Sequence, residues 1–184
     1  MSSDVRAWIG TVFRVVLAVI LFWSGFAKLL EGSDAMRRAI IAYRLGLPNG
    51  LTDLIAWGLP TLEIVLGLLL LVGLLTRWAA LGTALIMTAF IIGIASVWIR
   101  GYSIDCGCFG GGGDTTAAGR DARYAAEIAR DLLFAGMAVW LVKWPVTKFS
   151  LDRGPRPANA ELDDDVYDDD EIDPEDIATE EPTR

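Results

Sequence analysis

The chain has 184 residues, of which 53% are hydrophobic, and its formal net charge is −8. A soluble domain is normally about 45–50% apolar, so this composition favours a membrane protein. Residues 1–151 carry 13 basic and 10 acidic side chains, whereas residues 152–184 carry 3 and 14. The acidic balance therefore belongs to the C-terminal segment and indicates neither a basic substrate nor a nucleic-acid partner. The chain has no histidine and only two cysteines, which excludes histidine-based catalysis and confines thiol chemistry to one pair.

Four apolar stretches each approach the roughly 20 residues that a helix needs to cross a bilayer. They predict transmembrane helices at about 8–30, 54–75, 78–99 and 123–144. Only Thr76 and Arg77 separate the second and third stretches, which predicts an antiparallel hairpin. The first stretch is too long for the apolar region of a signal peptide, so we interpret it as an uncleaved helix. The predicted fold class is all-α, a polytopic four-helix transmembrane bundle.

The segments outside these stretches predict two further features. Arg37, Arg38, Ile40 and Ile41 indicate a short interfacial helix between the first two spans. The runs of aspartate within 152–184 cannot bury enough apolar surface to offset the entropy of ordering. We therefore predict a transmembrane domain over 1–151 and a disordered acidic tail over 152–184. The Lys/Arg bias of the loops is close to balanced and does not decide the orientation.

Glu63 lies near the middle of the second apolar stretch. An ionised carboxylate there costs about 2.5–3.5 kcal/mol on insertion scales, so it should face the bundle and have a partner. Counting helical rise from the same membrane face favours Arg130 as that partner, with Arg14 as the alternative. A purely structural role for Glu63 stays open. Lys28 and Arg77 lie at helix ends, where long basic side chains reach the headgroups and act as anchors.

Cys106 and Cys108 flank Gly107 in the loop before the last predicted helix. A disulfide that closes so small a ring departs from relaxed geometry and is easier to reduce, which favours a labile redox pair over a structural bridge. Nearby arginines would favour a thiolate, whereas Asp105 would oppose it. Two alternatives stay open: inert thiols, and half of a zinc site completed by another chain. No metal site is predicted within the chain.

The residues resemble the DoxX-like membrane proteins and, within them, the MauE (methylamine utilisation protein) branch. The resemblance covers nearly all of residues 10–145. Its most specific element is the Cys106-Gly-Cys-Phe-Gly110 loop. Less specific elements lie in the helices: Arg14, Phe22, Gly25, Lys28, Glu63, Gly67, Gly73, Thr76, Arg77, Arg130 and Asp131. The acidic tail is not part of the family pattern.

The resemblance implies a multi-pass protein of the cell membrane with both termini in the cytoplasm and the cysteine loop outside. It further implies a thioredoxin-like partner or subunits of a respiratory membrane complex; the methylamine role itself is not carried over. The main hypothesis is a thiol–disulfide oxidoreductase that uses Cys106 and Cys108, supported by Glu63, Arg130, Asp105 and Arg14. No cofactor is predicted in the chain, so electrons would pass to a quinone or to another subunit. The alternative is a non-catalytic accessory or assembly subunit of a respiratory complex. A transporter ranks lower, because the membrane region has few polar groups.

Overall fold

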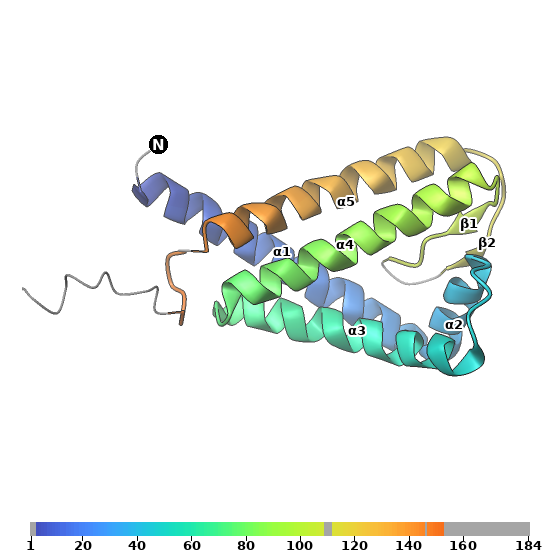
Figure 1. Cartoon of the computed structure of the whole chain (residues 1–184), viewed down its shortest axis with the longest axis horizontal. Helices are drawn as coiled ribbons and strands as arrows, with labels where there is room; N and C mark the ends of the chain where they lie inside the picture. Colours follow the sequence, from blue (N-terminus) through green and yellow to red (C-terminus); the bar gives the residue numbers. More distant parts are fainter. Residues whose placement is uncertain (1–2, 109–111, 146, 153–184) are drawn as a thin grey trace, which may run out of the picture. The chain divides into compact units, whose positions relative to one another are not determined.

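The computed structural model describes residues 3–108, 112–145 and 147–152. Within these residues, five helices and two short strands follow one another (Figure 1): α1 (Ser3–Glu31), α2 (Ser33–Ala42), α3 (Asn49–Val72), α4 (Thr76–Ile99), β1 (Ile104–Asp105), β2 (Gly113–Asp114) and α5 (Arg120–Lys143). Residues 109–111 of the cysteine motif and 153–184 of the acidic tail lie outside the described residues, so the prediction of a disordered tail stays untested.

The four long helices alternate in direction (Figure 1). α1 packs along α3, and α4 packs along α5. The core between them is built of aliphatic side chains, among them Leu17, Leu21, Leu66 and Leu70. Within the described residues, α1, α3 and α4 are the three helices that are long and apolar enough to cross a membrane. α5 has the same length as α3 and α4, but charged residues interrupt its first three turns.

Glycines bring α1 and α3 close together. A Cβ atom added at Gly25 would lie 2.7 Å from the carbonyl oxygen of Pro60, and one added at Gly67 would lie 3.0 Å from that of Ala18. Small residues at such positions allow helix backbones to approach within membranes. This tight contact fixes how the polar residues of α1 face those of α3.

The predicted hairpin of α3 and α4 is confirmed, with a shifted turn. α3 ends at Gly73, whose φ of 72° is left-handed and favours glycine, and its N–H donates to the carbonyl of Leu70. Thr76 and Arg77 belong to the first turn of α4. The carboxylate of Asp152 accepts hydrogen bonds from the N–H groups of Leu75 and Thr76. Asp152, which the prediction placed in the tail, thus caps the start of α4.

The short helix predicted between the first two spans is present as α2, between α1 and α3. Its buried face, with Met36 and Ile40, packs against Ala56 of α3. α2, the β1–β2 hairpin and the start of α5 lie at one end of the helices (Figure 1). The opposite end holds the first turn of α1 and residues 147–152, where Lys148 forms an ion pair with Asp4 at 3.1 Å.

Candidate functional site

The loop that carries the cysteines is closed at its base by two backbone pairings. β1 and β2 are antiparallel, with Ile104 opposite Asp114 and Asp105 opposite Gly113. Tyr124 of α5, which is buried, then fixes this hairpin to the bundle. Its hydroxyl oxygen accepts the N–H of Ile104 at 2.8 Å and lies 3.1 Å from the carbonyl oxygen of Tyr102. The two cysteines follow directly and enter the space between the helices.

Both cysteines are buried and free, with exposed fractions of 9% for Cys106 and 4% for Cys108. Gly107 between them has a φ of 67°, and its N–H donates to Asp105 Oδ1 at 3.0 Å. The N–H of Cys108 donates to the sulfur of Cys106 at 3.4 Å. Asp105, predicted to oppose a thiolate, therefore shapes the turn that brings the two thiols together.

The two thiols differ in their environment. A hydrogen bond from the Cys108 thiol lowers the pKa of Cys106, burial opposes this, and the Cys108 N–H adds to the lowering. The same hydrogen bond raises the pKa of Cys108, and burial raises it further. The pair therefore loses its first proton from Cys106, while Cys108 keeps its own.

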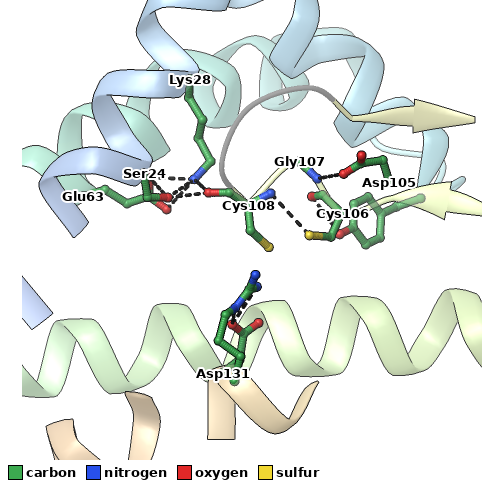
Figure 2. A network of polar contacts seen from close by, with 10 residues as sticks. Ser24, Lys28, Glu63, Asp105, Cys106, Gly107, Cys108 and Asp131 are labelled. Carbon is green, nitrogen blue, oxygen red and sulfur yellow. Dashed lines mark hydrogen bonds and ion pairs between the residues drawn. The ribbon is translucent and has the colours of Figure 1, made fainter. Parts of the chain in front are cut away.

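A buried polar cluster holds the carbonyl of Cys108 (Figure 2). Lys28 Nζ donates to this oxygen at 2.7 Å, to Glu63 Oε2 at 2.7 Å and to Ser24 Oγ at 2.6 Å. The hydroxyl of Ser24 also bonds to the Cys108 carbonyl. The side chains of Lys28 and Glu63 are 1% and 0% exposed. The cysteine loop is therefore anchored to a fully buried ion pair.

This cluster corrects the predicted partner of Glu63, which was wrong. Glu63 pairs with Lys28, whereas Arg130 pairs with its neighbour Asp131 at 2.9 Å. In Figure 2 Cys108 lies between Glu63 on one side and Asp131 on the other. The cysteine loop thus fills the space that the predicted pair would have had to cross.

The prediction of Lys28 as a headgroup anchor was also wrong. Side chains of a helix lean toward its N-terminus, and the N-terminus of α1 lies at the opposite end of the bundle. The lysine side chain therefore points back along α1 toward Ser24 and into the interior. The spacing of four residues between Ser24 and Lys28 on one helix is the sequence signal that could have indicated this contact.

Arg14, the alternative partner for Glu63, lies near the middle of α1, ten residues before Ser24. Its guanidinium donates to the carbonyl oxygens of Lys148 and Phe149 at 3.3 Å and 3.1 Å. It is 3% exposed and ties the segment after α5 to α1. The structure therefore separates Arg14 from the cysteines.

Three charged residues of α5 face the thiols. The Glu127 carboxylate lies near the side chain of Cys106 and interacts with it electrostatically. The positive charge of Arg130 favours the thiolate of either cysteine, whereas Asp131, which is 2% exposed, opposes that of Cys108. Sequence reasoning singled out Arg130 but assigned Glu127 no role at the cysteines. The spacing Glu127–Arg130–Asp131 places all three on neighbouring positions of one helix face.

Tyr43, at the end of α2, completes the surroundings of the pair. Its hydroxyl donates to the carbonyl of Cys106 at 3.2 Å. Thus each cysteine carbonyl has its own side-chain donor, from α2 for Cys106 and from α1 for Cys108. Among the described residues, no group of three or more side chains of the types that bind metal ions occurs.

Comparison with known proteins places the chain in one family. The family model described as "Methylamine utilisation protein MauE" matches residues 6–143. Neither the curated proteins nor the solved structures gave a match. The matched range contains α3, α4, α5, nearly all of α1 and both cysteines. The three apolar helices α1, α3 and α4 and this family fit a multi-pass membrane protein. The chain belongs to the MauE family of membrane proteins.

Proposed function

We propose that this MauE-family chain is a membrane thiol–disulfide redox protein. Cys106 and Cys108 cycle between the dithiol and the disulfide, and they exchange with a thioredoxin-like partner outside the cytoplasm. The observation that supports this most is the inequality of the two thiols. The sulfur of Cys106 accepts the N–H of Cys108 at 3.4 Å, and the pKa of Cys106 is lowered whereas that of Cys108 is raised.

An asymmetric pair suits exchange because thiolates, not thiols, attack disulfides. Starting from the chain's disulfide, a partner thiolate attacks one sulfur and the other leaves as a thiolate. The partner's second thiolate then attacks the mixed disulfide. The partner becomes a disulfide, and the chain holds Cys106 and Cys108 as a dithiol with two additional electrons and two protons. Inert buried cysteines would need neither the polar anchors of this loop nor charged neighbours.

The protons and electrons must then leave the pair. Glu63, predicted to support the redox pair, is held by Lys28. The carboxylate of Glu127 lies near Cys106, so our proposal assigns it the proton that this thiol releases. Arg130, predicted to pair with Glu63, interacts with both thiols instead, and in this proposal its charge stabilises the thiolate. The two electrons pass to a quinone or to another membrane subunit, because these 184 residues hold no second cysteine pair.

In this proposal α5 crosses the cell membrane as the fourth span. Its apolar part follows the charged first turns and reaches the end where Lys148 contacts Asp4. Both described ends of the chain thus lie on one side, as an even number of spans requires. We place that side in the cytoplasm and the cysteine loop outside, where disulfide exchange with exported proteins takes place.

The test is to trap the mixed disulfide. The probe is a thioredoxin variant that lacks its resolving cysteine and whose remaining active-site cysteine forms a mixed disulfide with a small thiol. A Cys108→Ser variant and a Cys106→Ser variant of the chain are each incubated with this probe. A covalent adduct that dithiothreitol removes is expected for at least one single variant. The Cys106→Ser/Cys108→Ser double variant is the control and should give none.

The wild-type protein provides a second readout. Alkylation of its two cysteines should differ between oxidising and reducing treatment, with two thiols modified only after reduction. Unchanged alkylation, together with no adduct, would falsify the redox proposal. Full function of the double variant in cells, and co-purification with a terminal oxidase, would support the accessory-subunit alternative instead.

A further inference from the structure

An apolar cavity of about 190 Å³ reaches one side of the cysteine loop. It lies among α2, α3 and α4, with Met36, Ile40, Leu59 and Phe90 in its walls. All of its lining residues are apolar except Tyr43 and Cys106, which form the side that faces the loop. The cavity therefore joins an apolar space to one of the two reactive sulfur-bearing residues.

The size of the cavity suits one substituted ring. An apolar cavity of about 150 Å³ is enough to bind benzene in a protein interior. The rim includes Leu45, which is 54% exposed, and Ala89, which is exposed on α4. A ring inside could thus carry an apolar tail that leaves past this rim into the bilayer.

Tyr43 forms a rigid part of this site. A Cβ added at Gly93 would lie 3.0 Å from its Cε1 atom, so the tyrosine ring packs directly on α4. The Tyr43 hydroxyl donates to the carbonyl of Cys106 at 3.2 Å. One side chain therefore forms both a wall of the cavity and a support for the cysteine.

We propose that this cavity binds the ring of a membrane quinone, which accepts the electrons of the Cys106–Cys108 dithiol. This inference rests on the proposed function and names its electron acceptor. The cavity is apolar, opens beside the exposed Ala89 of the apolar helix α4, and has Cys106 in its wall, which suits a lipid-soluble acceptor better than a polar one.

The step balances. Cys106 and Cys108 lose two protons and two electrons, and an S–S bond forms between their sulfurs. The quinone gains two electrons and two protons and becomes a quinol, which leaves through the rim. Glu127 accepts the proton of Cys106 on its way to the quinone or the aqueous phase. The disulfide is then ready for the next dithiol of the partner.

The test uses the full chain in lipid nanodiscs, reduced with dithiothreitol and freed of it without oxygen. The probe is a short-tailed quinone whose ring is fully substituted, so that thiols cannot add to it. The expected result is one quinol per chain, with the loss of both titratable thiols. The Cys106→Ser/Cys108→Ser variant should form none.

Two substitutions test the cavity itself. Ala89→Trp fills it from α4, and Leu45→Trp narrows it at the exposed rim. Each should slow quinone reduction by about tenfold or more, which corresponds to a rise of about 1.4 kcal/mol in the activation free energy. Ile92→Trp is the matched control, because Ile92 lies on the same helix, is 64% exposed and does not line the cavity. It should leave the rate unchanged.

The outcomes separate the two proposals. Adducts with thioredoxin but no quinol would overturn the quinone site and leave the proposed function standing. Equal rates in wild type, Leu45→Trp and Ile92→Trp would also overturn it, even if Ala89→Trp failed to fold. Absence of both adduct and quinol would overturn the proposed function itself.

Discussion

Replacing Lys28 with methionine removes the cation from a fully buried pair while keeping most of the volume of the side chain. Lys28 Nζ lies 2.7 Å from Glu63 Oε2 and has three further hydrogen bonds within 2.9 Å. At an effective dielectric constant of 20, this separation gives an attraction of about 6 kcal/mol before desolvation is subtracted. Breaking a buried pair by removing one partner costs about 3–5 kcal/mol, because the other charge stays buried. We therefore expect Lys28→Met to lower the free energy of unfolding by about 3–5 kcal/mol.

The assay is equilibrium unfolding in mixed micelles, followed by tryptophan fluorescence. Lys143→Met is the matched control, because Lys143 is an exposed lysine in the last turn of α5. The Lys28→Met/Glu63→Gln double variant leaves no buried charge and should recover at least half of the loss. If Lys28→Met cost no more than Lys143→Met, the buried pair would not hold the bundle as the geometry requires.

Three further predictions concern other parts of the structure. Gly67→Ala should lower the free energy of unfolding by about 1–3 kcal/mol by forcing α1 from α3, whereas Gly58→Ala on the same helix, with open space around it, should not. Asp152→Ala should cost about 0.5–2 kcal/mol at neutral pH through loss of the cap of α4. Burial raises the pKa of Asp152, but hydrogen bonds from Thr76 and Leu75 outweigh burial and lower it. The contribution of Asp152 to the free energy of unfolding is therefore complete above about pH 4, its pKa in the unfolded chain. It is lost as pH falls through the folded pKa, and melting curves of variant and wild type should then converge. Cys108→Ala should raise the pKa of Cys106, seen as slower iodoacetamide modification at neutral pH; an unchanged pH profile would contradict the hydrogen bond between the thiols.

Apolar length and turn signals were enough to predict the helical framework. The hairpin of α3 and α4 followed from two long apolar runs that almost touch in sequence, and α2 followed from its paired arginines and isoleucines. The ends of the helices in the structure differ from the predicted ones because helix caps depend on distant residues. Asp152, for example, caps α4 from 76 positions away in the sequence. No local pattern contains that information.

The site was predicted only in part, for a related reason. Cys106 and Cys108 stood out as the chain's two cysteines, and Glu63 as a buried charge, but nothing in the sequence indicates that the loop folds back between the helices. Once it does, it separates Glu63 from Arg130 and places the Cys108 carbonyl beside Lys28. The error over Lys28 came from using its position along the helix without the direction of its side chain.

The buried pair also has a role that its stability alone does not explain. A buried ion pair is often no more stabilising than apolar side chains of the same volume, so an apolar interior could hold α1 to α3 equally well. What apolar residues could not supply is two donors, from Lys28 and Ser24, aimed at one carbonyl of a glycine-rich loop. That carbonyl belongs to Cys108, and the Tyr43 hydroxyl holds the carbonyl of Cys106 in the same way. We infer that the pair serves to set the position of the cysteines. Lys28→Met should therefore speed maleimide modification of Cys108, and Lys143→Met should not.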